Sequence, residues 1–255
     1  MLVIFFGVWA GLFFSSKWTV PLPASWKLKM FDALIVRHRI ISSIHGLIAT
    51  LAGAYYSLYH LDLTCGKENT RLETLIMCNT SAFLLADLIF MIVNGFLDVG
   101  NLLHHMLGIC GYSAVFLSQR DASYFAFHIL PGEISNIQMN MREVFRKIGL
   151  RYTKLYFHNE FQYLVIYLIA RMFWIPSIYY FMFTCPSAGS VISVLYPIHC
   201  VQSFYYCLQM MKLLNQRWTE MNKIYKLGFK MEWFKSLDEK ELEKLGIKHY
   251  SNFKA

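Results

Sequence analysis

The sequence predicts an all-α fold, a polytopic membrane helix bundle of about seven transmembrane helices with the C-terminus inside. Of the 255 residues, 56% are hydrophobic, and the mean hydropathy is +0.38. Charged residues make up only 16% of the chain, well below the roughly 25% that is usual in soluble domains. The apolar residues gather in runs of about 20, the length that a helix needs to cross a bilayer.

Seven apolar segments are long enough, or nearly so, to cross a membrane. The first is short, but it has neither the positive n-region nor the cleavage site of a signal peptide, so we expect it to be retained. The fifth carries Glu133 and several amides. We expect it in the interior, shielded from lipid, with a kink at Pro131-Gly132. The expected spans are residues 1–16, 40–60, 74–97, 102–119, 122–141, 161–184 and 188–211.

The basic residues divide unequally between the two sides of such a bundle. Of the 24 Lys and Arg residues, only Lys67, Arg71 and Arg120 fall in loops on one side, and Arg171 lies within a span. Basic loops stay on the inner side, so this bias places the C-terminus in the cytosol or matrix. Because most basic residues flank apolar runs, the net charge of +8 does not indicate nucleic-acid binding.

The cysteines and histidines predict no metal site and no cofactor. The six cysteines show no CxxC spacing, which excludes the usual zinc arrangement. No helix face carries an HxxxH or ExxH pattern. Cys65 and Cys185 fall in expected loops on the outer side, and an oxidising compartment there would allow them to pair.

Ionisable side chains interrupt five of the expected spans. Because such groups are costly at membrane depth, they mark a function or a specific partner. At a rise of 1.5 Å per residue they all fall in the inner half of the bilayer. Adjacent helical residues point about 100° apart, so we expect only one of His104 and His105 to face inward. The residues expected to line one inward-opening polar pocket are His45, Asp87, His104, His105, Glu133, Asn140 and Arg171.

These groups also have structural interpretations, which the sequence leaves open. Asp87 and Arg171 would satisfy each other as an ion pair between helices, with no further role. A buried guanidinium keeps its proton, so we expect Asp87 or Glu133 to neutralise Arg171. His45 is equally well explained as a histidine that hydrogen-bonds a nearby group within the bundle.

The same residues resemble those of the TLC-domain family. This multi-span lipid-sensing domain is shared by ceramide synthases, translocating-chain-associated membrane proteins and small TLC-domain-containing transmembrane proteins, and the chain is most similar to the last group. The resemblance covers about residues 35–215 of an expected TLC-like transmembrane domain, 1–215. It rests on five segments in order: RIISSIH, SAFLLADLIF, LLHHMLGICGY, GEISNIQMNMR and ARMFWIPSIYY.

The resemblance implies lipid handling, and we favour the binding or sensing of an acyl chain or membrane lipid in the polar pocket. Ceramide synthases, the enzymatic branch, are N-acyltransferases that use acyl-CoA, and their pattern has the histidine pair and two later aspartates. Here Glu133 and Asn136 stand at the aspartate positions, so one carboxylate is kept and one is lost. As an enzyme, the chain would use His104 or His105 with Glu133 for catalysis.

A third interpretation is a non-catalytic accessory subunit of a larger membrane complex. The endoplasmic reticulum is the family's usual location, and the mitochondrial inner membrane is the alternative. Residues 216–255 are expected to form a basic interfacial tail, on lipid or on a protein partner. Within the tail, Ser236 and Glu239 predict a capping box that starts a short amphipathic helix, and Gly246 predicts its end.

Overall fold

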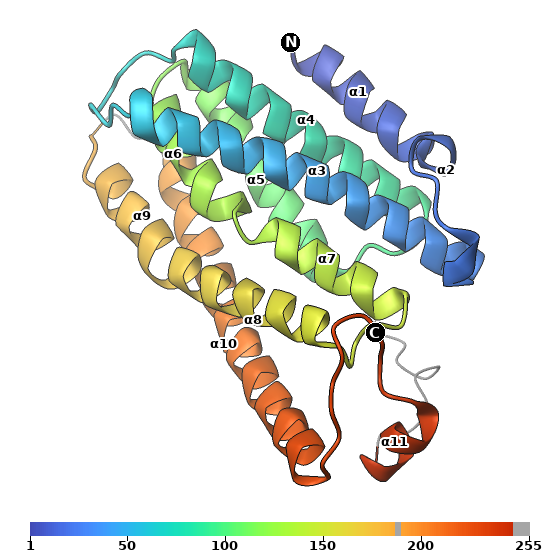
Figure 1. The fold of residues 1–255 in the computed structure, drawn as a ribbon. Coiled ribbons are helices and arrows are strands. Elements are labelled where there is room, and N and C mark those ends of the chain that lie inside the picture. The colour runs from blue at the N-terminus through green and yellow to red at the C-terminus, as the bar shows by residue number, and fades with distance from the viewer. Residues whose placement is uncertain (187–189, 247–255) are drawn as a thin grey trace.

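The computed structural model describes residues 1–186 and 190–246, and the regular structure in these ranges is helical (Figure 1). The elements in chain order are α1 (Leu2–Phe14), α2 (Ser16–Thr19), a 3-10 turn (Ala24–Trp26), α3 (Met30–Tyr59), α4 (Arg71–Val93), α5 (Val99–Ser118), α6 (Ala122–Glu133), α7 (Asn136–Lys147), α8 (Lys154–Ile169), a π-helix (Ala170–Trp174), α9 (Ile175–Phe183), α10 (Ser190–Lys226) and α11 (Glu239–Lys244).

Three helical segments of the described residues are long and apolar enough to cross a membrane. They are α3, α4 and the continuous helix Lys154–Phe183, and α1 is a shorter apolar helix. Large apolar side chains such as Leu51 and Phe173 remain exposed on these segments, as is required of a surface that faces lipid. The chain is an integral membrane protein. The count of seven spans and the inward C-terminus stay predictions.

Several helices are longer than the expected spans. Helix α3 begins at Met30, so the basic residues Arg37 and Arg39 belong to the helix and not to a loop. Helix α8 begins at Lys154 instead of residue 161, and α10 continues to Lys226, well past residue 211. Lys and Arg end an apolar run but are good helix formers, so the helices outlast the hydropathy that predicts them.

The expected fifth span is two helices. Helix α6 ends at Glu133 and α7 begins at Asn136, so the helix is interrupted shortly after Pro131. Proline removes a backbone donor and crowds the preceding turn. A second interruption, the π-helix Ala170–Trp174, comes shortly before Pro176. Both interruptions fall beside ionisable residues of the expected pocket.

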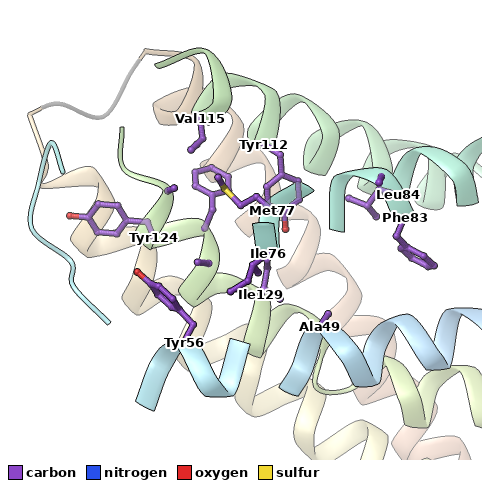
Figure 2. Close-up of a cluster of buried hydrophobic side chains, with 14 of the residues drawn as sticks. Ala49, Tyr56, Ile76, Met77, Phe83, Leu84, Tyr112, Val115, Tyr124 and Ile129 are labelled. Atoms are coloured by element: carbon purple, nitrogen blue, oxygen red, sulfur yellow. The ribbon is translucent and has the colours of Figure 1, made fainter. Parts of the chain in front are cut away.

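The helices pack around one main apolar core. Helix α1 lies along α4, α3 packs against α6 and α7, and α10 packs against α5 and α8 (Figure 1). Figure 2 shows part of the core, in which Tyr56 of α3 and Met77 of α4 are almost fully buried. Helices α3 and α6 approach so closely that a Cβ on Gly53 would lie 2.8 Å from the Leu130 nitrogen. Small residues permit such contacts between membrane helices.

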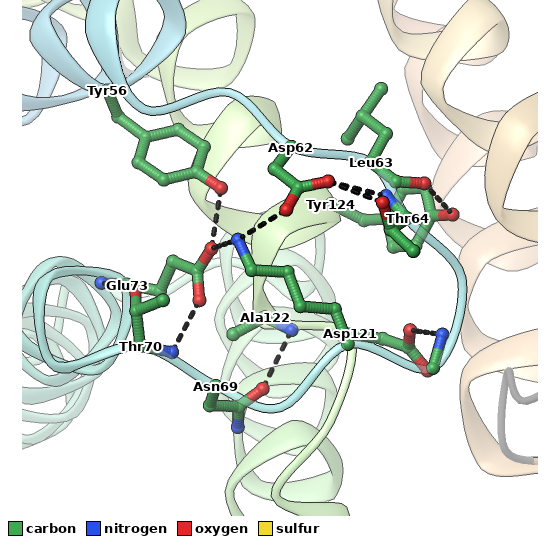
Figure 3. Close-up of polar contacts among 12 residues, drawn as sticks. Tyr56, Asp62, Leu63, Thr64, Asn69, Thr70, Glu73, Asp121, Ala122 and Tyr124 are labelled. Carbon is green, nitrogen blue, oxygen red and sulfur yellow. Dashed lines mark hydrogen bonds and ion pairs between the residues drawn. The ribbon is translucent and has the colours of Figure 1, made fainter.

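The loop between α3 and α4 lies at one end of the bundle, which we call the loop end, and it is fixed by polar contacts (Figure 3). Glu73 is only 1% exposed and accepts hydrogen bonds from Tyr56 Oη at 2.6 Å and Lys67 Nζ at 3.3 Å. Hydrogen bonds from Thr64, and then one from Lys67, lower the pKa of Asp62 to about 2. These contacts order a loop that the sequence predicts only as a connection.

A disulfide joins the same loop to the end of α9. Cys65 and Cys185 are bonded, with their Cα atoms 5.4 Å apart. The Asn69 side chain accepts a hydrogen bond from the Ala122 backbone at 2.9 Å, which ties the loop to the start of α6 (Figure 3). The pairing that the sequence left open is therefore present in the structure.

The tail packs against the opposite end of the bundle, which we call the tail end. Ile224, Leu237 and Leu245 form a small apolar cluster with Tyr152. The capping box of α11 uses Asp238 and Glu241, so the expected box of Ser236 with Glu239 is wrong. Burial of Leu237 in this cluster holds residue 236 in the loop, and Asp is a strong N-cap. The described part of the tail thus packs against the helical bundle of the same chain. Residues 247–255 lie outside the described residues.

Candidate functional site

Asp87 on α4 lies between two buried histidines. Its Oδ2 is 2.8 Å from His105 Nε2, and its Oδ1 is hydrogen-bonded to His38 Nε2. The other ring nitrogen of His105 contacts the Asn101 carbonyl oxygen at 2.7 Å. Both ring nitrogens of His105 face oxygen atoms. One proton therefore lies between His105 Nε2 and Asp87 Oδ2, whether the histidine or the aspartate carries it. The carboxylate therefore connects α3, α4 and α5.

His38 is a polar residue of the site that the sequence analysis missed. It is 1% exposed, and its ring stacks on Phe13 at 5.4 Å and on Phe90 at 5.7 Å. Its neighbours in the sequence, Arg37 and Arg39, placed it in an expected loop. The available signal was spacing, since His38 lies seven residues before His45 and therefore shares its helix face.

His45 and Glu133 form a second polar contact. His45 Nδ1 lies 3.7 Å from Glu133 Oε2, and the same carboxylate oxygen accepts a hydrogen bond from Asn136 at 2.7 Å. The His45 ring is fully buried and stacks on Phe83 with 3.7 Å between ring centroids. His45 therefore lies behind Glu133 and Phe83, and it does not line the cavity described below.

Arg171 does not form the expected ion pair with Asp87 or Glu133. Within the described residues neither carboxylate lies within 4.0 Å of its guanidinium. Arg171 donates instead to the Gly132 carbonyl oxygen at 3.0 Å and lies 3.2 Å from His199 Nε2. The physical reason is that Asp87 is engaged by two imidazoles and Glu133 by Asn136. The direct hydrogen-bond partners of this buried cation are therefore neutral groups.

A polar cavity of about 280 Å³ opens among these side chains at the tail end of the bundle. Both His104 and His105 lie on its wall, although only one of them was expected there. Their rings are perpendicular with centroids 5.7 Å apart, and the cavity extends around α5 far enough to touch both. Six of the seven residues expected in the pocket line it, namely Asp87, His104, His105, Glu133, Asn140 and Arg171.

A narrower cavity of about 70 Å³ adjoins the polar one on the side of the loop end. Its wall is mostly apolar and includes Gly108, Gly111 and Phe125. His128 Nε2 and Tyr196 Oη are buried on this wall without a hydrogen-bond partner in the described structure. The residues shared by the two cavities are Leu84, His104, Glu133, Arg171 and His199. The two cavities therefore lie next to each other, with these shared residues at the junction between the polar and the apolar space.

Ion pairs close the tail end of the bundle below the cavity. Glu160 is 1% exposed and lies 2.6 Å from Arg142 Nε and 2.7 Å from Arg217 Nε. Arg142 belongs to the GEISNIQMNMR segment of α7, and Glu160 on α8 joins it to Arg217 on α10. In the part of the chain that the structure describes, no group of three or more His, Cys, Asp and Glu side chains is placed to hold a metal ion.

Comparison with protein families matches the TLC domain over residues 36–223. The match covers most of the chain, which therefore belongs to the TLC-domain family. The matched range agrees with the expected range of about 35–215. At its C-terminal end it is slightly longer and includes most of the last part of α10. The family associates this integral membrane protein with a lipid-related function. Comparisons with curated proteins and with solved structures give no match.

Proposed function

We propose that this protein binds an acyl lipid inside the bundle, as a sensor or handler of that lipid. One observation carries the proposal: the polar cavity and the narrow apolar cavity adjoin each other and share His104, Glu133 and Arg171 on their walls. Pockets that combine an apolar wall with a few convergent polar groups are typical ligand sites. A lipid has the same two parts, a polar head group and an apolar chain.

The groups at the junction are suited to head-group oxygens. Arg171 is 7% exposed, lies in a π-helix and has its Nε without a partner in the described structure. A π-helical turn is costly and is often found at functional sites. Because the guanidinium has no acceptor on the protein for this N–H, a ligand oxygen would supply the missing hydrogen bond.

The test is to measure lipids that remain bound to the purified protein by native mass spectrometry with lipid analysis. Gly108→Leu would fill the apolar cavity, since even a Cβ there lies 2.7 Å from Leu84 Cδ1. We expect this variant to lose most of the bound acyl lipid. Gly7→Leu on α1 is the matched control, because a Cβ there meets nothing within 4 Å. Equal lipid retention by both variants, or no specific lipid on the wild type, would count against the proposal.

A second candidate function is N-acyl transfer from acyl-CoA, and the Asp87–His105 pair favours it. A histidine oriented by a buried carboxylate on a cavity wall is the usual arrangement of a general base. The partner of His105 is Asp87, whereas the sequence suggested Glu133. In an assay of long-chain amine acylation, His105→Ala should lose at least about 100-fold in rate. Absence of turnover by the wild type would exclude this candidate.

A further inference from the structure

A basic groove lies where the tail meets the start of α8. The Lys154 backbone N–H donates to the Glu232 carbonyl oxygen at 2.8 Å, which holds the segment Lys230–Lys235 against the helix. Trp233 stacks on His158 with 5.3 Å between ring centroids, and Lys154 Nζ lies 5.9 Å from the Trp233 ring. The residues that line the groove are Lys154, Lys230, Met231, Glu232, Trp233, Phe234 and Lys235.

The length of the adjoining helix indicates where in the bilayer this groove lies. The continuous helix Lys154–Phe183 has 30 residues, which corresponds to about 45 Å at 1.5 Å per residue. A bilayer is about 40–45 Å thick with its head groups and about 30 Å without them. A helix that spans the whole bilayer therefore places its first residue, Lys154, in the head-group layer. Because Glu232 and Trp233 contact Lys154, the rest of the groove lies close to that layer.

The groove is also continuous with a surface that faces lipid. Phe161, Val165 and Phe173 are exposed along the same helix, and Phe161 lies one turn above His158, on which Trp233 stacks. Trp233 is 49% exposed and Phe234 is 74% exposed. Aromatic rings are enriched at this depth, and lysines near the surface attract anionic lipids. The three lysines outnumber the single acid of the groove, Glu232.

We propose that this groove binds the phosphate of an anionic phospholipid in the tail-side leaflet. Lys154, Lys230 and Lys235 supply the charge, and Trp233 and Phe234 enter the interface beside the lipid. The bound lipid fixes the tail against α8. This inference does not depend on the proposed function, because the groove is separate from the cavity within the bundle.

The experiment measures amide hydrogen exchange of residues 230–235 in the full-length protein in lipid nanodiscs. Adding phosphatidylglycerol to phosphatidylcholine discs should slow this exchange by about tenfold, and the effect should weaken with salt. The variant with Lys154→Gln, Lys230→Gln and Lys235→Gln should lose most of the slowing. Its exchange in pure phosphatidylcholine discs shows whether the tail still folds.

A matched control removes the same charge elsewhere in the tail. Lys226→Gln, Lys240→Gln and Lys244→Gln alter exposed lysines outside the groove, and this variant should keep the response. Equal loss of the response in both triple variants would overturn the proposal. Equal slowing by inorganic phosphate in phosphatidylcholine discs would overturn the assignment to a lipid. No slowing by phosphatidylglycerol in the wild type would overturn it as well.

Discussion

Asp87→Ala tests whether the carboxylate between two imidazoles holds α3, α4 and α5 together. Asp87 is 5% exposed, and its carboxylate bonds to both His38 and His105. A hydrogen bond to a charged group contributes about 1.5–3 kcal/mol in soluble proteins. Polar contacts between membrane helices average only about 0.6 kcal/mol. Two such bonds therefore contribute between about 1 and 6 kcal/mol in total.

The surroundings of Asp87 place its contribution near the middle of this range, well above the average for polar contacts between membrane helices. His38 is enclosed by Phe13 and Phe90, so after loss of the carboxylate its ring nitrogen has no new partner. We expect Asp87→Ala to lower the free energy of unfolding by about 3–4 kcal/mol. At roughly 2–4 °C per kcal/mol for a chain of this size, the melting temperature should fall by about 10 °C. Asp87→Asn keeps one acceptor oxygen and should show about half of the effect.

Thermal unfolding of the purified protein in nanodiscs is the assay, and Asp32→Ala is the matched control. Asp32 pairs with Lys147 at 2.7 Å, but the two side chains are 30% and 23% exposed. An exposed pair of this kind contributes at most about 1 kcal/mol. If Asp87→Ala destabilises the protein no more than Asp32→Ala does, the carboxylate does not hold the three helices together.

Two further predictions concern packing and the disulfide. Gly53→Val should destabilise the bundle by about 1–3 kcal/mol, because its side chain collides with the Leu130 backbone, whereas Gly11→Val on α1 should have little effect on thermal unfolding. Cys65→Ser should lower the free energy of unfolding by about 2–5 kcal/mol, since the disulfide with Cys185 links residues 120 positions apart in the sequence. Alkylation of the unreduced, denatured wild type should label four of the six cysteines, and labelling of all six would refute the pairing.

The sequence predicts the helices better than it predicts their limits. Within the described residues each expected span coincides with helical structure, because about 20 apolar residues leave few alternatives in a membrane; residues 188 and 189 of the last span lie outside the described residues. The limits differ where charged helix formers continue a helix past its apolar part, as at Met30 and Lys226. Pro131 predicted a kink near the break after Glu133. The position of the break depends on how α6 and α7 each pack against α3.

The members of the site were easier to predict than their partners. Depth along each helix brought Asp87, His105 and Arg171 to the same half of the bilayer, and the structure places them around one cavity. Depth does not fix the rotation of a helix, so the pairing of Asp87 with His105 in place of Arg171 was beyond the sequence. His38 was missed for a simpler reason, since a hydropathy criterion assigns any histidine between two arginines to a loop.

The two ends of the bundle differ in how firmly they are held, and this difference bears on how a lipid would reach the cavity. At the loop end the disulfide and the contacts of Glu73 and Asn69 cross-link α3, α4, α6 and α9. The polar cavity lies toward the tail end, between the start of α5 and Met210 on α10. The two interruptions of helical hydrogen bonding, after Glu133 and at the π-helix, both border this cavity. At the tail end the cross-links are ion pairs, those of Glu160 with Arg142 and Arg217, and no disulfide lies there among the described residues. Ion pairs separate and re-form more readily than a covalent bond, so local opening is easier at this end. A lipid bound as proposed therefore enters from the tail-side leaflet, chain first, and leaves its head group beside Arg171.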